Sequence, residues 1–437
     1  MDLFLTDPIK MVYDWLMQLL TGWGLPGAVA NVLLILVGIV VLIIVAMTID
    51  IMLVWLERKV VARFQGRLGP NRVGLFGLLQ PIPDIIKLII KEDITPTGAD
   101  KVVFNMAPIL SLASVIFLWA VIPLAATVYG ADLNVGLLYL VAAGALGTLS
   151  IIMAGWASNN KYAVLGAYRQ VATMLSFEIP MIAALLIPTI LASSLSLKTI
   201  TAAQGGVWFF WLSPLGALIF LVAAIAELGR SPFDLNEGES EIVSGYHIEY
   251  TGMKFGLFFA GELLHAFTFG AFIGILFFGG WSFFGVERIP GLGWMASSPY
   301  FGAVAVLLKG VFFYWVIMWI KYTVPRIRID HMLAFNWKFL TPLSFVLLMV
   351  TAMVNRLLQD FANTPQWPIY VGGMFLSNIL IGWITIEILR VYGRKQKAKE
   401  PVQQAAQNAA VQSAVQSAVQ SAVQSAVQSA VQSAVHH

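Results

Sequence analysis

Nine long apolar runs dominate this chain, and they constrain its fold more than any other feature of the sequence. A run of about 20 residues is long enough to cross roughly 30 Å of hydrocarbon as a helix. Only 11% of the 437 residues are charged, whereas a soluble domain carries about a quarter. The runs lack the alternation of membrane β-strands, so we predict an all-α membrane protein, a polytopic bundle of about nine transmembrane helices. The runs lie near residues 29–56, 104–129, 134–157, 171–194, 208–228, 253–280, 301–324, 339–358 and 368–390.

The positive charges predict how this bundle is oriented. Lysine and arginine accumulate in the cytoplasmic connections of membrane proteins. If the N-terminus lies outside, the inner connections hold 21 of the 26 lysine and arginine residues, and the outer ones hold four. This asymmetry supports an odd number of spans and a cytoplasmic C-terminus. We expect the protein to lie in a cell inner membrane. The net charge of +3 then reflects topology, and nothing indicates nucleic-acid binding.

The sequence divides into four predicted parts. The first is a retained amphipathic segment on the outer side, because its early aspartates differ from the positive start of a signal peptide. An eight-span core and a ninth transmembrane helix follow. A basic stretch and six VQSA repeats form a low-complexity tail with no expected catalytic role. These parts cover residues 1–28, 29–360, 361–393 and 394–437.

The chain offers no ligands for a redox cofactor of its own. It contains no cysteine, which excludes disulfides and thiolate ligation of an iron–sulfur cluster. Only His265 of the five histidines lies within a predicted span, so two histidines cannot hold haem there. No Gly-rich dinucleotide or phosphate-binding pattern is present, and no metal site is predicted. Redox or nucleotide chemistry must therefore belong to partner subunits.

Carboxylates inside the predicted spans are the first candidates for chemistry, because ionisable groups in hydrocarbon are costly. Glu178 lies nine residues after Arg169, and Glu262 lies eight residues after Lys254. Both therefore lie roughly 12 to 14 Å below the inner surface. Glu227 lies near the inner end of the fifth run. A desolvated carboxyl group can bind and release a proton near neutral pH, so these acids predict a proton relay.

A purely structural role is the alternative for buried acids. Glu178 and Glu262 could each pair with a buried base such as Lys309 and only hold helices together. That interpretation is stronger for Asp50 and Glu387, which lie near the inner ends of their spans with an arginine in reach. The arginines concerned are Arg58 and Arg390.

Residues 229–252 form an unusually acidic connection on the predicted inner side. Inner connections usually carry lysine and arginine, so the negative charge of this connection requires an explanation. A solvated surface is one reading, and a set of acids that passes protons toward the buried carboxylates is the other. The five carboxylates of this acidic loop are Asp234, Glu237, Glu239, Glu241 and Glu249.

A basic segment at 55–74 and an amphipathic segment at 80–93 follow the first span. The glycines and proline of the basic segment impose turns that a plain helix end would not need. The amphipathic segment carries charges on one helical face and isoleucines on the other, which is typical of a helix lying in the membrane interface. Together they could form a portal for an amphiphile, or they could only anchor the chain at the membrane surface.

Several of these segments resemble one family, the quinone-site membrane subunit of respiratory complex I, known as the H subunit in the bacterial NADH:quinone oxidoreductases and as subunit 1 in mitochondria. The similarities occur in family order and cover about residues 30–358. The matching segments are ERK at 57–59, GRLGPNRVG at 66–74, LLQPIPDIIKLIIKED at 78–93, GWASNNKYAVLGAYR at 155–169, AELGRSPFDLNEGESEIVSGYHIEY at 226–250 and KYTVPRIRID at 321–330.

The resemblance implies a subunit of a translocase that reduces quinone with electrons from NADH and pumps protons. Its partners would be the hydrophilic quinone-module subunits, which carry the iron–sulfur clusters, FMN and NADH, together with small membrane-arm subunits and lipid. The first and sixth spans and the interfacial helix would frame a quinone tunnel, while the acidic loop and Glu178, Glu227 and Glu262 would form the first proton path. The residues implied for the tunnel region are Arg58, Arg67, Asp84, Arg326 and Arg328.

Two other functions compete with this one. The equivalent subunit of a membrane-bound hydrogenase or ferredoxin-linked dehydrogenase would share the motifs, although the intact GRLGPNRVG segment favours the quinone-reducing branch. A stand-alone proton-coupled transporter would be expected to show paired halves with broken helices, and we find no such repetition. The ninth span and the tail depart from the shorter mitochondrial form. Asp50 has no counterpart there, so it inherits no role.

Overall fold

The computed structural model describes residues 7–234, 245–283, 298–361, 368–391, 393, 394 and 416. Across these residues the chain is helical, with turns between the helices and no strand, so the predicted all-α fold is confirmed. The chain divides into two units, one ending at Asn378 and the other beginning at Ile379. Three acids of the acidic loop lie outside the described residues, as does nearly all of the tail: Glu237, Glu239 and Glu241.

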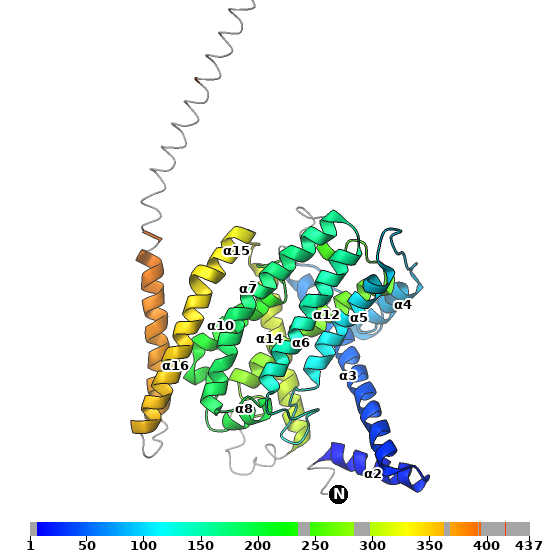
Figure 1. Ribbon diagram of the computed structural model, residues 1–437, viewed down its shortest axis with the longest axis horizontal. Coiled ribbons are helices and arrows are strands. Elements are labelled where there is room, and N and C mark those ends of the chain that lie inside the picture. Colours follow the sequence, from blue (N-terminus) through cyan, green and yellow to red (C-terminus); the bar gives the residue numbers. More distant parts are fainter. Residues whose placement is uncertain are drawn as a thin grey trace, which may run out of the picture. The chain divides into compact units, whose positions relative to one another are not determined.

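The long helices of the first unit lie side by side, with short helices at the two ends (Figure 1). A further helix, Pro368–Val391, begins in this unit and ends in the second. The elements are α2 (Pro8–Gly22), α3 (Gly27–Phe64), η1 (Leu75–Gly77), α4 (Pro81–Ile90), α5 (Lys101–Trp119), α6 (Gly136–Ala157), α7 (Lys161–Ala192), α8 (Leu197–Ala203), α9 (Phe209–Leu212), α10 (Pro214–Glu227), η2 (Gly245–His247), α12 (Gly252–Phe277), α14 (Pro299–Thr323), α15 (Ile329–Phe335), η4 (Asn336–Leu340) and α16 (Thr341–Phe361).

Eight helices within the described residues are long and apolar enough to cross a membrane. They match eight of the nine predicted runs. The fifth run, 208–228, differs because Pro214 begins a new helix and so divides the run into α9 and α10. α10 has 14 residues and spans only about 21 Å, less than a full crossing. The second run also ends earlier than predicted, since α5 stops at Trp119.

The four connections predicted to be cytoplasmic meet at one end of the bundle. Lys254, in the first turn of α12, forms a salt bridge of 2.8 Å with Asp93, which follows α4. Glu249 accepts a hydrogen bond from the residue that caps α7. The backbone N–H of Ile327, after α14, donates to the Pro232 carbonyl at 3.1 Å. The sequence therefore assigned these connections correctly to a common end.

The connections predicted to be outside meet at the opposite end, where α8 lies (Figure 1). Lys198 in α8 is 3.8 Å from Asp132, which precedes α6. Gln204, after α8, accepts a hydrogen bond from the Gly279 N–H at 2.8 Å and so reaches the end of α12. Its amide nitrogen donates to the Ile275 carbonyl at 2.8 Å. These contacts bring the described parts of three of these connections together at this end.

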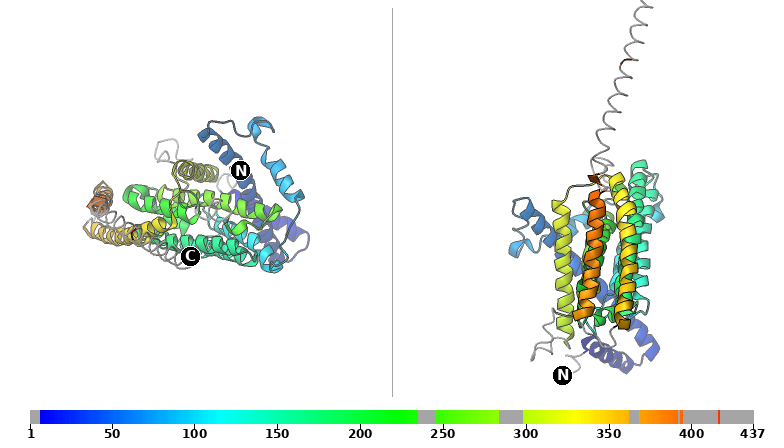
Figure 2. Two further views of the ribbon diagram at one scale, coloured as in Figure 1. Left: turned by 90° about the horizontal axis from the view of Figure 1, so that it is seen from above. Right: turned by 90° about the vertical axis from the view of Figure 1, so that its left-hand side faces the viewer.

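The predicted interfacial helix is present as α4, ten residues long. It lies beside the long helices (Figure 2) and packs against α3 and α12. α12 can approach closely because Gly256 has no side chain; a Cβ there would lie 3.1 Å from Leu88 Cδ1. The isoleucines of α4 include the exposed Ile82, Ile86 and Ile90. An amphipathic helix with its apolar face uncovered is suited to the membrane interface.

The ninth span is held against the fifth by a buried asparagine near its middle. Asn378 is 2% exposed, and its amide nitrogen donates to the carbonyls of Leu212 and Met374 at 3.1 Å each. Its amide oxygen accepts from Ser213 Oγ at 3.1 Å. Leu212 and Ser213 lie at the break between α9 and α10. Since lipid supplies no donor for a carbonyl at a helix break, Asn378 stabilises the divided fifth span.

Candidate functional site

Glu57 in α3 collects three polar groups from α14. Tyr322 donates a hydrogen bond to Glu57 Oε1 at 2.7 Å, and Lys321 Nζ lies 3.2 Å from the same oxygen. Tyr314 donates to Oε2 at 3.3 Å. Tyr314 lies two turns before Lys321 and Tyr322 on the same side of α14, which explains why one helix supplies all three groups. Glu57 is 8% exposed, so this set of donors replaces the water that an ionised carboxylate requires.

Arg230 connects Glu57 to Glu262. It follows α10 directly and is 2% exposed. Its Nε lies 3.2 Å from Glu262 Oε1, and its Nη1 lies 4.0 Å from Glu57 Oε1. A buried guanidinium needs opposite charge on hand, and here α3 and α12 each supply a carboxylate. The three groups therefore form one ion cluster, in which Arg230 and Glu57 are buried and Glu262 is partly buried.

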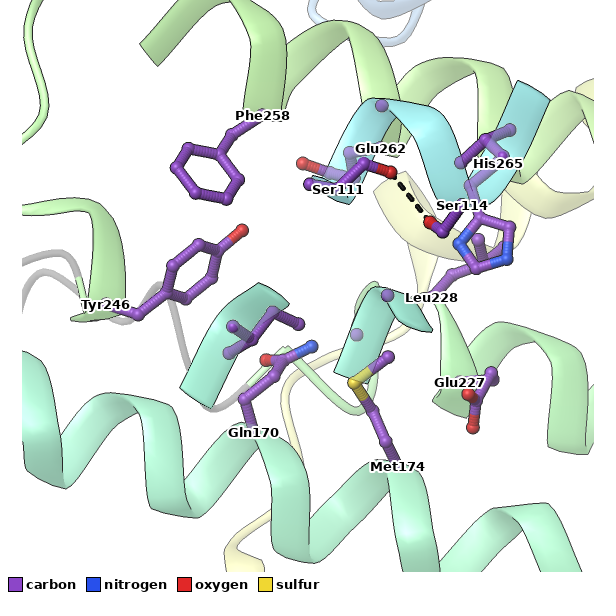
Figure 3. A pocket seen from close by; sticks show the side chains of 15 residues that line it. Ser111, Ser114, Gln170, Met174, Glu227, Leu228, Tyr246, Phe258, Glu262 and His265 are labelled. Atoms are coloured by element: carbon purple, nitrogen blue, oxygen red, sulfur yellow. Dashed lines mark hydrogen bonds between the residues drawn. The ribbon is translucent and has the colours of Figure 1, made fainter. Parts of the chain in front are cut away.

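A cavity continues from Glu262 between α12, α7 and α5. Figure 3 shows Glu262 and His265 reaching it from α12, with Gln170 and Met174 entering from α7 on the opposite side. Tyr246 of η2 closes one side of the cavity. The polar residues that line this cavity are Ser111, Ser114, Gln170, Glu227, Tyr246, Glu262 and His265.

A second, smaller cavity lies beside Glu178. Its lining includes Glu178, Glu227 and His265, and the last two also line the first cavity. Glu227 Oε2 and His265 Nε2 are buried without a hydrogen-bond partner among the described residues. The two cavities therefore share an acid and an imidazole, and they place Glu262, Glu227 and Glu178 in succession. The structure thus brings together the three carboxylates that the sequence singled out.

Lys309 does not pair with Glu178 or Glu262, as the structural alternative supposed. Its ammonium group donates to the carbonyls of Phe278, Gly280 and Ser282 at 2.6, 2.8 and 2.6 Å. These carbonyls lie at and beyond the end of α12, where a cation is favourable for the helix dipole. The cation that contacts Glu262 is Arg230 instead.

The described acids of the acidic loop are paired with neighbouring connections. Asp234 Oδ2 lies 3.0 Å from Arg326 Nη2, and its other oxygen is buried without a hydrogen bond. Glu249 accepts a hydrogen bond from Asn160 Nδ2 at 2.8 Å. These two acids therefore hold the connections after α14 and before α7 against the loop.

The residues implied for the tunnel region are spread along the charged end. Arg58 forms an ion pair with Asp84 and so joins α3 to α4. Arg326 pairs with Asp234, as described above. Arg67 Nε donates to the nearby Gln65 at 2.7 Å, and Arg328 is exposed at the start of α15. Only Arg58 and Asp84 meet each other at the junction of α3, α4 and α12.

η2 forms a packed aromatic wall beside the first cavity. The His247 ring lies 5.1 Å from that of Tyr246 and 5.5 Å from that of Phe255. Burial lowers the pKa of His247, while the charge of Glu262 opposes the shift. Burial also raises the pKa of Tyr250, whose hydroxyl donates to the Phe104 carbonyl at 3.2 Å. Both side chains are therefore neutral at pH 7.

Sequence reasoning missed the centre of the ion cluster. Glu57 was considered only as part of the basic segment 55–74, and Arg230 only as part of the motif at 226–250. Lys321, Tyr322 and Tyr314 received no role. The signal was present, because Arg230 lies within one motif and Lys321 begins another, but only folding shows that both reach one carboxylate. Among the described residues there is no group of three side chains that could hold a metal ion.

Fold and site together define a class of protein: a polytopic helical membrane protein whose buried acids and cations lead from one charged end into the bundle. The sequence profile of a family described as NADH dehydrogenase matches residues 37–352. The chain belongs to this family, and the resemblance carried by the motifs is confirmed.

Relatives of the chain carry a more specific name, the H subunit of NADH-quinone oxidoreductase. The one from Dehalococcoides mccartyi (strain CBDB1) is 45% identical over 322 residues, covering 74% of this chain and 87% of that protein. The protein of the same name from Geobacillus kaustophilus (strain HTA426) is 45% identical over 300 residues, covering 68% and 87%. That of Bacillus thuringiensis (strain Al Hakam) is 44% identical over 305 residues, covering 69% and 88%.

Proposed function

We propose that this chain is the quinone-site membrane subunit, the H subunit, of a proton-translocating NADH:quinone oxidoreductase, complex I. In that assembly it forms the quinone tunnel and cavity with neighbouring subunits, and it holds the first buried-carboxylate proton path. The observation that carries the proposal is the succession of Glu57, Arg230, Glu262, Glu227 and Glu178 from the charged end into the bundle.

This succession is suited to moving protons because its two halves differ in charge balance. In the half nearer the charged end, Arg230 and Lys321 offset the charges of Glu57 and Glu262. In the half deeper in the bundle, Glu227 and Glu178 line a cavity together with His265, whose Nε2 has no hydrogen-bond partner, and no cation contacts the two acids among the described residues. Two neighbouring carboxylates inside a bundle favour having at least one proton between them, because their like charges repel each other. A proton that arrives at Glu262 can therefore be stored further in.

The quinone end of the proposal rests on the junction of α3, α4 and α12. The Arg58–Asp84 pair fixes α4 to α3, and the salt bridge between Lys254 and Asp93 fixes the end of α4 to α12. α4 presents its isoleucines outward, so an amphiphilic quinone could approach along an apolar surface and meet charge at the junction. Glu57 and Arg230 lie just behind it, so charge that develops on a reduced quinone would act on the ion cluster first.

Partners and location follow from the same proposal. NADH, FMN and the iron–sulfur clusters would be bound by hydrophilic partner subunits, small membrane subunits would continue the proton path, and quinone would be the substrate. The inner membrane, with the charged end on the cytoplasmic side, is the location that the lysine and arginine distribution favours. The sister function in a hydrogenase or ferredoxin-linked enzyme is less well supported, since the relatives named above are quinone oxidoreductase subunits.

Glu262→Gln in the assembled complex tests this function. The amide keeps the size of the side chain but cannot titrate, so NADH:quinone reductase activity and proton pumping should both fall by about a hundredfold or more, the lower end of the range for a lost acid–base group. Reduction of a water-soluble acceptor by NADH should persist, because it needs only the partner subunits. Glu387→Gln is the matched control, since Glu387 is exposed and pairs with Arg390.

The outcomes separate function from assembly. Normal quinone reduction and pumping in an assembled Glu262→Gln complex would remove Glu262 from the proton path. Loss of all activities together, with less complex in the membrane, would mean that the substitution damaged assembly, and the Glu178→Gln variant would then be measured in its place. An isolated assembly with iron and hydrogen- or ferredoxin-linked activity, but none with NADH, would assign the chain to the sister function.

A further inference from the structure

Asp50 is a buried acid of α3 that the proposed path does not use. It lies seven residues before Glu57, which corresponds to two helical turns and about 10 Å along the same face. The flanking stretch, IIVAMTIDIMLVW, contains no other ionisable residue. Asp50 is 6% exposed, so its side chain faces the protein and not lipid.

The explanation expected from the sequence does not hold for this residue. Arg58 was expected to lie within reach of Asp50, but Arg58 pairs with Asp84. Asp50 Oδ1 is buried without a hydrogen-bond partner among the described residues. An unpaired buried carboxylate is strongly unfavourable, whereas an apolar residue would pack there without that desolvation. The acid therefore needs a reason other than helix packing.

Among the helices that pack against α3, α14 and α12 supply the groups around Glu57, whereas Asp84 of α4 pairs with Arg58, Lys254 of α12 with Asp93, and Lys309 of α14 with backbone carbonyls. From α14, Lys321, Tyr314 and Tyr322 contact the Glu57 carboxylate. From α12, Glu262 contacts Arg230, which also approaches Glu57. These groups favour the ionised form of Glu57. A second negative charge on Asp50, two turns away on the same buried face, would be repelled by that of Glu57.

We propose that Asp50 is a further proton-binding residue of the network, and that Asp50 and Glu57 hold one proton between them. The proposal rests on the proposed function. With Lys321 and Arg230 at Glu57, the proton resides on Asp50 and the negative charge on Glu57. When Arg230 follows Glu262 and leaves Glu57, the O–H bond at Asp50 breaks, water molecules between the two side chains carry the proton, and an O–H bond forms at Glu57. Net charge in the membrane is unchanged, while the negative charge moves about 10 Å along α3.

This assignment gives α3 a second use in the mechanism. α3 carries Arg58 at the junction with α4, Glu57 in the ion cluster and Asp50 two turns deeper. A change of charge at the junction of α3 and α4 would therefore alter the protonation of Asp50, which lies deeper in the membrane on the same helix. The branch through Asp50 is distinct from the succession that leads through Glu262, Glu227 and Glu178.

Asp50→Asn in the assembled complex is the first experiment, with Thr48→Val as its control. Thr48 lies two residues away on the exposed face of α3, so the control removes a polar group of similar size from the same turn. Asp50→Asn should lower NADH:quinone reductase activity on the order of a hundredfold, as for other lost proton-transfer groups, while Thr48→Val and reduction of a water-soluble acceptor stay at the parent level. Parent-like quinone reductase activity and pH profile in Asp50→Asn would overturn the proposal.

Asp50→Glu keeps a proton-binding group and guards against an assembly defect. It should retain much of the activity but displace the midpoint of the pH–rate profile, because the longer side chain alters the distance to Glu57. An unchanged pH profile in Asp50→Glu would mean that the residue serves structure only. Glu262→Gln, measured in parallel, separates the two proposals: if it abolishes turnover while both Asp50 variants match the parent, only the assignment of Asp50 fails.

Discussion

Arg230 allows a quantitative test of the ion cluster. Arg230→Met removes the guanidinium but keeps a long side chain in the same space. Glu262 then loses the cation 3.2 Å away, whereas Glu57 keeps Lys321 and Tyr322. The variant therefore leaves Glu262 without a cation in a partly buried site.

The size of the effect follows from the distances. At an effective dielectric constant of about 20, opposite charges 3.2 Å apart attract by about 5 kcal/mol and charges 4.0 Å apart by about 4 kcal/mol. Desolvation offsets much of this attraction, and removing one member of a buried pair costs about 3–5 kcal/mol in measured cases. A folded domain is stable by only about 5–15 kcal/mol. Arg230→Met should therefore lower the stability of the subunit severely.

The double variant Arg230→Met, Glu262→Gln removes both charges and should recover part of this loss, because no unpaired charge remains. We expect the midpoint temperature for loss of this chain from the purified assembly to fall in the order parent, double variant, Arg230→Met. The four proteins of the cycle, including Glu262→Gln alone, give the interaction directly. A double variant no more stable than Arg230→Met would refute the idea that these two side chains stabilise each other.

Two further predictions concern other parts of the chain. Asn378→Leu should weaken the packing of the ninth span against the fifth by about 1–3 kcal/mol, because the Leu212 carbonyl at the helix break loses its donor. Since the chain has no cysteine, a pair of cysteines introduced into the fifth and ninth spans would report this change as a lower yield of disulfide cross-link. An unchanged yield would contradict the role of Asn378. Arg67→Ala should reduce quinone turnover more than reduction of a water-soluble acceptor in the assembled complex, and equal loss of both would indicate an assembly defect.

Much of the fold was predictable because hydrocarbon imposes simple demands. Length, apolarity and the positions of lysine and arginine were enough to find eight crossing helices and to sort their connections into two ends. The fifth span was the exception. Its composition is as apolar as the others, but Pro214 cannot continue the helix of α9, and only the distant Asn378 makes that break tolerable. Such a partner lies more than 150 residues away and leaves no local pattern.

The candidate site was predictable only where a carboxylate lay deep inside a run. Glu178, Glu227 and Glu262 stood out for that reason, and the structure places them along two adjoining cavities. Glu57 did not stand out, because it begins a basic segment at a membrane boundary, where charge is expected. What distinguishes it is enclosure by α14 and Arg230, which is a tertiary property.

The same comparison explains why Lys309 was a misleading partner. A lysine within a predicted span invites pairing with a buried acid, since charge in lipid must be compensated. Lys309 is compensated by backbone carbonyls at the end of α12, which a sequence does not display as charge. Backbone carbonyls thus stabilise the ammonium group of Lys309 at one end of α12, and Arg230, supplied from the connection after α10, contacts the acid nearer its other end. Among the buried cations of the described residues, Arg230 is therefore the one that contacts the acids of the network. A displacement of this side chain is the change through which quinone chemistry could alter their protonation.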